Sequence, residues 1–456
     1  MSILIQMNKE LPVIIDLFSG CGGLGFGFKS AGFEIAHGMD IWDSASRTAS
    51  FNLYSAFGEE GKHDCGDITQ LNPEVFSTSI GEKGCIVIGG PPCQAYSQIG
   101  KAKLRSLGGA HTSDSRGYLF KDFIRIGLEL DARAIVMENV PEAVNYGGLN
   151  VPQFVCDTLE EKGYHAKWTI LNAADYGVPQ VRERVFVIAV KKSEADGIVL
   201  PFPTHKSPDN RLTPGQSRFK NFEQFPNFIY PNETSCDLPK WVTVEDALSD
   251  LPSLFPSYKS KYVLYEPLNY KPYETEIQND YQQLMRTWNG YELKNVTNLG
   301  FRKTIRDFPI FDRMKPGDDY RAASIIAERL LEEACRALAI NSNSDSEAYE
   351  KLRKSIVPPY DREKFFSKWK KLDPLKPSHT LVAHLSVDTY SHLHPCEPRG
   401  ISVREAARLQ SFPDAFKFQC PMSDAFKQIG NAVPPLLSKA IAEALSNVFT
   451  KTGVKL

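Results

Sequence analysis

Between residues 11 and 190, short apolar runs alternate with helical stretches, and few folds accept this pattern. Each run is short enough to form one buried strand, and the stretches between runs can form helices. Strands joined in this way pair in parallel, and the connecting helices cover both faces of the sheet. The sequence therefore predicts an α/β domain, with strands at 13–15, 34–39, 85–88, 134–137 and 184–190.

After residue 190 the alternation is lost, and proline, asparagine and aromatic residues dominate the chain up to residue 395. This composition is typical of loops, so we expect a separate, loop-rich lobe. Within it, apolar residues recur at helical spacing over 320–340, which predicts a packed amphipathic helix. A second helix is predicted after Pro434 and Pro435. We therefore expect a first domain over 1–190, a lobe over 191–395 and a segment over 396–456 that completes the first domain.

Composition excludes some classes of protein. The chain has 456 residues and a formal net charge of −2, so it lacks the positive charge of a simple nucleic-acid binder, and contacts with phosphate must use local patches. No apolar run reaches the roughly 18 residues that a membrane span needs, and the N-terminal residues do not resemble a secretory signal. We expect a soluble, cytoplasmic protein. Its 9 cysteines lack paired spacing, which favours reduced thiols.

A glycine-rich turn follows the first predicted strand. Gly20, Gly22 and Gly25 have the spacing G-x-G-x-x-G, and Asp40 ends the second predicted strand. Glycines let the backbone approach a ligand, and an acid at the second strand end can accept hydrogen bonds from ribose hydroxyl groups. The pattern indicates a nucleotide or nucleoside ligand, although NAD or a turn without a ligand would also fit. Asp67, in the turn GDIT, is placed to accept a hydrogen bond from an adenine amino group.

A cysteine follows the third predicted strand. The run 85–88 leads directly into GGPPCQAYSQIG, so Cys93 leaves the carboxyl end of a parallel strand, where sheets of this kind bind ligands. The Gly-Gly-Pro-Pro sequence forms a rigid turn with little side-chain bulk. A single cysteine is most often a small core residue, but a thiol held in this position can act as a nucleophile once it is deprotonated.

Charged residues adjoin two further predicted strands. The run 134–137 brings Glu138 to the same sheet edge as Cys93, where a carboxyl group can act as an acid beside a nucleophile. Arg182 and Arg184 enter another strand, and the alternation of side chains puts both on one face. There they can point together at an anion or a ring carbonyl. Without a function, Glu138 would be a strand-end carboxylate in an ion pair, and Arg182 and Arg184 would be a solvated pair at the sheet edge.

In this order, the motifs resemble those of the cytosine carbon-5 DNA methyltransferase family. The resemblance covers about residues 11–190 and 372–448 and includes DLFSGCGG, GDIT, GGPPCQAYSQIG, DSRGYLF, ENV, QVRER, RGISVREAARLQSFPD and GNAVPP. It implies a Rossmann-like domain that uses S-adenosylmethionine, with a smaller lobe that recognises the DNA target. Two positions depart from the family. The second-strand acid, usually Glu, is Asp40, and the residue after it, often Trp, is Ile41.

The resemblance also assigns residues to the two ligands. It implies that S-adenosylmethionine is contacted by Phe18, Gly20, Gly23, Asp40, Ile41, Asp67, Leu119, Asn431 and Val433. It implies that the cytosine is faced by Cys93, Glu138, Arg182 and Arg184. The implied reaction is methyl transfer to carbon 5 of a cytosine that is flipped out of a specific duplex DNA sequence, after Cys93 adds to the ring. Such an enzyme can be the modification half of a restriction-modification system.

The sequence also predicts roles for other segments of the chain. Residues 101–117 resemble the family's mobile loop that closes over DNA. Contacts with phosphate in the lobe are expected from Arg302, Arg306, Lys364, Lys368, Lys370 and Lys371. The spacing of His392, His394 and Cys396 suggests zinc, but family members have a similar His-Pro stretch before RGISVREAARL, so we expect no metal. We expect a monomer that acts on duplex DNA.

Three other functions would share some of these sequence features. A tRNA cytosine methyltransferase would have the same catalytic motifs but usually has a shorter second lobe. A regulatory DNA-binding relative without activity is expected to have lost the cysteine or the glutamate, and both are present. An NAD-dependent dehydrogenase would explain the glycine-rich turn but not Pro-Pro-Cys-Gln or Glu-Asn-Val.

Overall fold

The computed structural model describes residues 11–61, 63–92, 118–209, 213–254, 270–288, 290, 292–341, 345–365, 368–385 and 390–450. The chain divides into two compact units. The first unit is made of Met1–Trp241 with Ala432–Leu456, and the second is Val242–Asn431.

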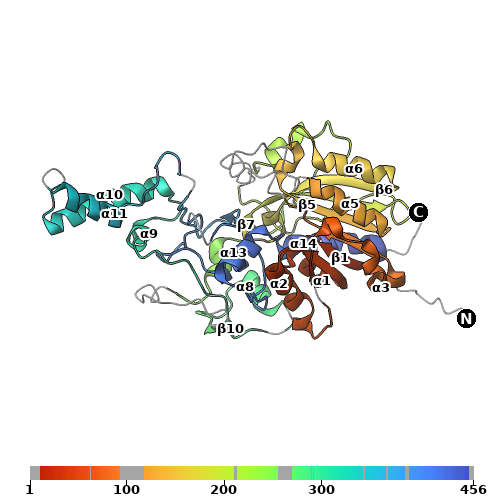
Figure 1. The fold of residues 1–456 in the computed structure, drawn as a ribbon, viewed down its shortest axis with the longest axis horizontal. Helices are drawn as coiled ribbons and strands as arrows, with labels where there is room; N and C mark the ends of the chain where they lie inside the picture. Colours follow the sequence, from red (N-terminus) through yellow and green to blue (C-terminus); the bar gives the residue numbers. More distant parts are fainter. Residues whose placement is uncertain are drawn as a thin grey trace, which may run out of the picture. The chain divides into compact units, whose positions relative to one another are not determined.

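The first unit is built on a seven-stranded sheet with the strand order β3-β2-β1-β4-β5-β8-β6 (Figure 1). Neighbouring strands from β3 to β5 pair in parallel, whereas β8 runs antiparallel to both β5 and β6. The strands of the sheet are β1 (Val13–Leu17), β2 (Ile35–Asp40), β3 (His63–Cys65), β4 (Cys85–Gly89), β5 (Ala134–Asn139), β6 (Tyr164–Asn172) and β8 (Glu183–Lys191).

Every strand expected from the apolar runs is present, as β1, β2, β4, β5 and β8. The expectation that all strands run parallel is wrong for β8. Only residues 173–182 separate β6 from β8, and a parallel crossover needs a dozen residues or more, so these two strands must pair antiparallel. Strand β6 was not expected, because polar residues interrupt its first half, YHAK, and hide the apolar run.

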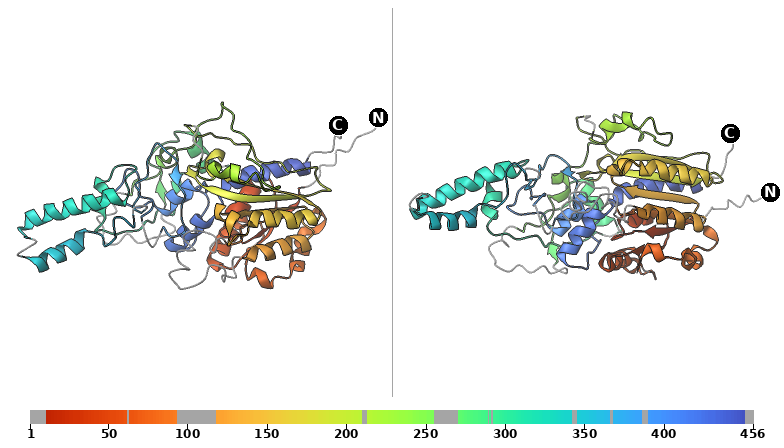
Figure 2. Two further views of the ribbon diagram at one scale, coloured as in Figure 1. Left: turned by 90° about the horizontal axis from the view of Figure 1, so that it is seen from above. Right: turned by 45° about the horizontal axis from the view of Figure 1, so that its top comes forward.

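Helices cover both faces of this sheet, as the α/β class requires (Figures 1 and 2). Helices α5 and α6 pack on the face that carries Val13, Ile15 and Leu17. Helices α1, α2 and α14 lie on the other face, where Asp16 meets α1 at Gly25. The helices are α1 (Gly23–Ser30), α2 (Asp43–Leu53), α3 (Ser77–Ile80), α5 (Leu119–Glu129), α6 (Val151–Glu161) and α14 (Pro435–Thr450).

The C-terminal helix α14 packs closely on α1. A Cβ atom added to Gly27 would lie 2.3 Å from the Cβ atom of Ser438, so only glycine allows this approach. The Ser438 hydroxyl donates a hydrogen bond to the carbonyl oxygen of Leu24 at 2.5 Å. The part of the chain that returns to the first unit begins at Ala432, which is later than the expected position 396.

The first unit also extends past residue 190, as far as Trp241. Residues 200–209 and 213–241 lack long regular elements, yet the part around Asn227 and Phe228 packs on β6. The side chain of Asn227 donates to the carbonyl oxygen of Ala166 at 2.8 Å, and the rings of Phe228 and Trp168 lie 4.9 Å apart. Composition indicated where regular structure ends, but it could not show which unit the irregular segment covers.

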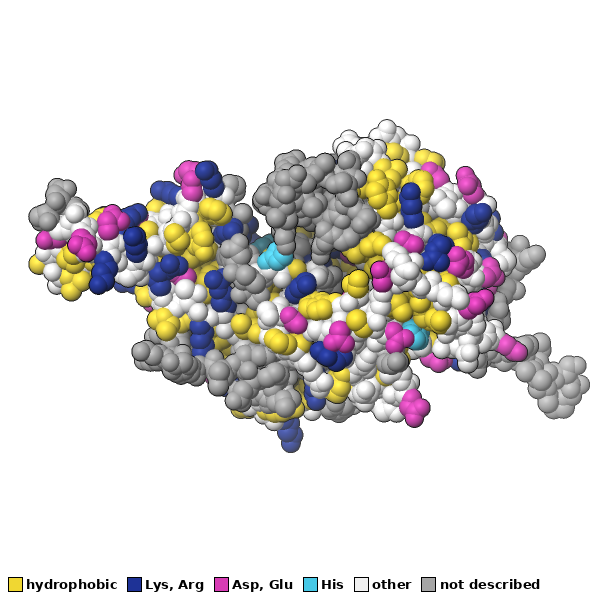
Figure 3. All heavy atoms as spheres, viewed as in Figure 1, with side chains coloured by type: hydrophobic (Ala, Val, Ile, Leu, Met, Phe, Trp, Pro, Cys, Tyr) yellow, Lys and Arg dark blue, Asp and Glu magenta, His cyan; other side chains and the backbone are white. Residues whose placement is uncertain are grey.

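The second unit consists of helices, short strands and irregular segments. The expected helix over 320–340 is α10, but its buried side chains include Ala323, Ala327 and Leu331, whereas Ile325, expected in the apolar face, is 38% exposed. Basic and acidic side chains are interspersed over α10 and its neighbour α11 (Figure 3). The elements are α7 (Val244–Leu248), β9 (Lys271–Pro272), α8 (Asp280–Thr287), β10 (Asn295–Val296), α9 (Phe308–Arg313), α10 (Tyr320–Leu338), α11 (Ser346–Ile356), β11 (Ser378–His379), α12 (Val403–Leu409) and α13 (Met422–Asn431).

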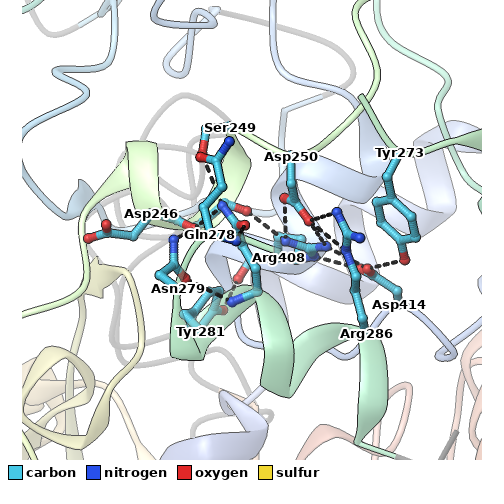
Figure 4. Close-up of polar contacts among 12 residues, drawn as sticks. Asp246, Ser249, Asp250, Tyr273, Gln278, Asn279, Tyr281, Arg286, Arg408 and Asp414 are labelled. Carbon is cyan, nitrogen blue, oxygen red and sulfur yellow. Dashed lines mark hydrogen bonds and ion pairs between the residues drawn. The ribbon is translucent and has the colours of Figure 1, made fainter. Parts of the chain in front are cut away.

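A buried ionic network lies at the centre of the second unit (Figure 4). Arg408 is fully buried and donates to Asp414 at 2.6 Å and to Asp250 at 3.0 Å. Asp250 also accepts from Arg286 at 2.9 Å, and Asp414 accepts from the Tyr273 hydroxyl at 2.6 Å. Burial is the largest single influence on the pKa of Asp414 and would raise it, but the charge and hydrogen bonds of Arg408, together with the charge of Arg404 and the bond from Tyr273, lower that pKa overall.

Helix α12 supplies Arg408 to this network and begins with a capping box. The Ser402 side chain accepts from the backbone of Glu405, and the Glu405 carboxylate accepts from the Ser402 backbone at 2.6 Å. Arg399 also donates to Glu405. The sequence RGISVREAARLQSFPD therefore forms part of the core of the second unit.

Candidate active site

Glu138 and Arg184 meet at the carboxyl edge of the sheet. Oε1 of Glu138 lies 2.9 Å from Nε of Arg184, and each side chain is 12% exposed. Both side chains point to the same face of the sheet. Glu138 pairs with Phe186 on the neighbouring strand, and Arg184, two residues from Phe186, points to the same face as Phe186. Burial raises the pKa of Glu138, although the charges of Arg184 and Arg182 partly oppose this rise. The carboxyl group therefore keeps its proton to a higher pH than an ordinary glutamate.

Arg182 is buried between β7 (Gln180–Val181) and β8, with 1% of its surface exposed. One of its terminal nitrogens, Nη2, donates to the carbonyl oxygen of Ala432 at 3.1 Å. It acts on Glu138 through its charge. Arg182 therefore also holds the start of the returning C-terminal segment.

The backbone after β4 runs beside Glu138. A Cβ atom at Gly90 would lie 2.9 Å from Oε2 of Glu138, so the glycine allows this approach. Nδ2 of Asn139 donates to the carbonyl oxygen of Pro91 at 3.2 Å. Cys93 and the expected mobile loop at 101–117 lie outside the described residues. The described chain nevertheless reaches Pro92, next to Cys93 in the sequence, at this edge.

The turn after β1 and the end of β2 form an open cradle. Oδ2 of Asp40 accepts from the backbone N–H of Gly20 at 2.8 Å, and Oδ1 accepts from that of Trp42 at 2.8 Å. Phe18 and Gly20 have positive φ angles of 55° and 54°, and in the described part of the chain no residue beyond the neighbours of Gly20 has an atom within 4 Å of a Cβ built on it. Beside Asp40, the side chain of Ile41 is 73% exposed. A carboxylate offers about four acceptor sites on its two oxygens, so an acid at this position is chemically suited to a nucleoside.

The remaining expected cofactor residues lie in different places. The carboxylate of Asp67 accepts from Thr69 N–H at 2.9 Å, and Gly66 before it donates to the carbonyl oxygen of Asp40 at 3.0 Å, so Asp67 lies near the cradle. Gly23 and Leu119 begin α1 and α5, both at the carboxyl edge of the sheet. Val433 is buried in the first unit, whereas Asn431 is exposed and ends α13 in the second unit.

Two residues that help to build this edge were not expected from the sequence. Asn139 holds the Pro91 carbonyl oxygen, and Glu183 accepts two bonds from the backbone N–H of Gly215, at 2.7 and 2.8 Å. Asn139 stands next to Glu138 in the motif ENV, which was a usable signal. Nothing near Glu183 in the sequence indicates a partner 32 residues away.

The histidines of residues 391–398 have protein partners. Nε2 of His392 lies 3.1 Å from the carbonyl oxygen of His379, and Nδ1 of His394 accepts from the backbone N–H of Glu397 at 2.9 Å. Burial lowers the pKa of His394 to about 4, so it is neutral at pH 7. Among the described residues, no group of three or more His, Cys, Asp or Glu side chains could hold a metal ion.

The expected contact of Lys371 with phosphate is wrong. Lys371 is 6% exposed, its Nζ donates to the carbonyl oxygen of Phe311 at 2.9 Å, and burial lowers its pKa. Lys364 fits the expectation better because its side chain is 79% exposed. Spacing in the sequence does not distinguish these lysines, because burial is decided by tertiary packing.

Comparison with known proteins places this chain in a family. A sequence model described as C-5 cytosine-specific DNA methylase matches residues 13–447. The putative type II methyltransferase M.OihORF3336P of Oceanobacillus iheyensis is 54% identical to this chain, over 96% of each protein. Type II methyltransferase M.AgeI of Thalassovita gelatinovora is 31% identical, over 94% of this chain and 98% of that protein.

A solved structure shares the fold. It is a putative DNA modification methyltransferase encoded within an E. coli prophage, 23% identical, with a TM-score of 0.63 over 97% of this chain and 100% of that chain. In the described residues, no helix is both long and apolar enough to cross a membrane. The extent of the family match and the 54% identity lead to one conclusion: the chain belongs to the C-5 cytosine-specific DNA methylase family and is a DNA (cytosine-5-)-methyltransferase.

Proposed function

We propose that this enzyme transfers the methyl group of S-adenosylmethionine to carbon 5 of a flipped cytosine in a specific duplex DNA sequence, with Cys93 as the nucleophile. The observation that carries the proposal is the contact between Glu138 and Arg184 at the sheet edge where the backbone leads into Cys93. A buried carboxyl that retains its proton and a fixed guanidinium are the two groups that a cytosine ring needs beside a thiolate.

The cradle at the ends of β1 and β2 fits S-adenosylmethionine. Asp40 is anchored by two backbone N–H groups and keeps capacity to accept bonds from ribose hydroxyl groups. The exposed side chain of Ile41 offers an apolar surface for the adenine ring, and Asp67 lies nearby. Asp40 and Ile41, although unusual for the family, therefore keep the required chemistry. When bound, the cofactor supplies an electrophilic methyl group.

Cys93, Glu138 and Arg184 have separate roles in the proposed reaction. Cys93, as a thiolate, forms a bond to carbon 6 of the cytosine, and this addition makes carbon 5 electron-rich. Glu138 donates to ring nitrogen 3, and Arg184 holds the ring oxygen, so negative charge does not accumulate on the ring. After carbon 5 has gained the methyl group, loss of its proton and release of Cys93 restore the aromatic ring. A stacked base is inaccessible to these groups, so the cytosine must be flipped out.

The second unit is the part that we assign to recognition of the target sequence. Exposed cations such as Lys364 are suited to phosphates, which position DNA without choosing among bases. The relatives named as type II methyltransferases support a role as the modification half of a restriction-modification system. We further propose that the enzyme acts as a monomer in the cytoplasm.

Bisulfite sequencing of DNA from cells that express the chain tests the proposed function. We expect protected cytosines at one position of a single short sequence, and none in cells that express Cys93→Ser. Methyl incorporation into purified duplex DNA and into tRNA should be compared in the same preparation. Incorporation into tRNA with no protected DNA cytosines would contradict the proposal.

Replacing Glu138 by glutamine should slow methyl transfer by roughly 100-fold or more, because a neutral amide cannot transfer a proton to ring nitrogen 3. Glutamine has nearly the same shape and can still accept a bond from Arg184. The activity of the unchanged enzyme should fall as pH rises through the raised pKa of Glu138, since the protonated form is required. Single-turnover rates across pH provide the measurement. A Gln variant with the same pH profile would exclude Glu138 as the acid.

A further inference from the structure

The first unit contains a cavity that is separate from the proposed cofactor cradle. It has a volume of about 570 Å³ and is formed by the end of β6, the short helix η7 (Ala173–Tyr176), the short helix η8 (Gln216–Asn221) and residues 230–241. All of its lining residues belong to the first unit. Its volume is within the usual range for a site that binds a small molecule or part of a larger ligand.

This cavity opens at the same sheet edge as Glu138. Leu171 and Asn172, which line it, pair directly with Arg184 and Glu183 across the two strands β6 and β8. Arg184 in turn contacts Glu138 at 2.9 Å. Strand β6 lies two strand spacings from β5, which is about 10 Å. A polymer substrate with one residue at Glu138 therefore has its neighbouring residues within reach of this cavity.

The lining combines aromatic rings, the two carboxylates of Asp175 and Glu233, and the cation of Lys220. Tyr230 is 47% exposed, and Trp241 is partly exposed and donates its indole N–H to Oδ1 of Asp175 at 2.8 Å. Lys220 is exposed at the rim. Bases stack on aromatic side chains, a carboxylate accepts from the amino groups of bases, and lysine attracts phosphate. An apolar ligand would use the rings alone and would remove water from Asp175 without adding a donor to those that Trp241 already supplies.

Asp175 is suited to be an acceptor at neutral pH. Burial raises its pKa to about 6, while bonds from Trp241 and Asn172 oppose this rise. The group is therefore mostly ionised at pH 7. Its Oδ1 is held by Trp241, so the orientation of the carboxylate is fixed before a ligand arrives.

We propose that this cavity, here called the Tyr230 pocket, binds one nucleobase of the substrate DNA close to the flipped cytosine. The proposal rests on the proposed function, because it requires the target cytosine to lie at Glu138. Tyr230 provides a ring for the base to stack on, Asp175 accepts from an amino group on the base edge, and Lys220 lies near the adjoining phosphate. The catalytic unit would thus contribute to target selection independently of the second unit.

An abasic scan combined with substitution of Tyr230 tests the pocket. Duplexes carry the target sequence found by bisulfite sequencing, each with one base removed at a different position beside the target cytosine. For the unchanged enzyme, we expect one abasic position to weaken binding by about 10- to 100-fold, which is the range for loss of one base–aromatic stack. Tyr230→Ala should weaken binding to the intact duplex by a similar factor. Because this variant has already lost the stacking contact, it should bind that one abasic duplex almost as tightly as it binds the intact duplex.

Matched variants exclude general effects. Tyr230→Phe keeps the ring and should bind like the unchanged enzyme. Phe57→Ala removes a similarly exposed aromatic side chain, 42% exposed, and should change no duplex affinity. Asp175→Asn keeps the shape of the carboxylate. In this variant, removal of the base at that one position should weaken binding by less than it does in the unchanged enzyme. Unchanged affinity for S-adenosylmethionine verifies that each variant is folded.

The outcomes separate the two proposals. If the unchanged enzyme methylates the duplex but Tyr230→Ala and Asp175→Asn weaken all duplexes equally, or none, the pocket does not bind a base and only this inference is overturned. If the unchanged enzyme methylates no DNA, the proposed function fails and this inference fails with it. Coupling confined to one abasic position supports the Tyr230 pocket.

Discussion

Cys93→Ser is expected to lower the rate of methyl transfer by roughly 10⁴-fold or more, a loss comparable to removal of the covalent nucleophile from other enzymes. A serine hydroxyl is almost entirely protonated near neutral pH and is a much weaker nucleophile than a thiolate. S-adenosylmethionine should bind with unchanged affinity, because the cradle proposed to hold it is built around Asp40 and Gly20. Transfer of a radiolabelled methyl group and calorimetric titration of the cofactor measure the two effects separately.

The control for this experiment is Cys396→Ser, which makes the same chemical change at an exposed cysteine. Its turnover should match that of the unchanged enzyme. A Cys93→Ser variant that retained turnover within tenfold would remove Cys93 from the proposed mechanism. Loss of cofactor binding in the same variant would instead indicate that Cys93 supports the cofactor site.

Arg408→Met should destabilise the second unit by about 3–5 kcal/mol, because Asp250 and Asp414 would lose the cation that pairs with both in a fully buried site. Methionine has a similar length, so little of the effect would come from a cavity. For a unit of this size, that loss corresponds to a fall in melting temperature of roughly 6–20 °C. Hydrogen exchange followed by mass spectrometry reports each unit separately. Peptides from α12 should lose protection, and peptides from β4 and β5 should not.

Arg313→Met is the matched control for Arg408. Arg313 and Glu333 form an ion pair at 3.4 Å in the same unit, but their side chains are 48% and 53% exposed. Exposed pairs of this kind contribute at most about 1 kcal/mol, because water screens the charges. If the two variants were equally stable, the buried network would not be what stabilises the second unit.

The sequence alone was sufficient for five strands of the sheet and for the turn anchored by Asp40. Apolar runs show where β1, β2, β4, β5 and β8 lie, and glycine spacing together with the strand-end acid indicates the turn in which Gly20 donates to Asp40. These are local properties, since backbone freedom and side-chain alternation act over a few residues. The family resemblance, rather than local reasoning, predicted that Glu138 and Arg184 face the same ligand, and the structure places these two side chains in contact.

Tertiary structure decided what depends on distant partners. The segment that contains Asn227 and Phe228 belongs to the first unit because it packs on β6. Residues 396–431 belong to the second unit because Arg408 is buried between Asp250 and Asp414. The burial of Lys371 has the same origin. Such outcomes follow from the free energy of desolvating and pairing groups far apart in the chain, which no short stretch of sequence contains.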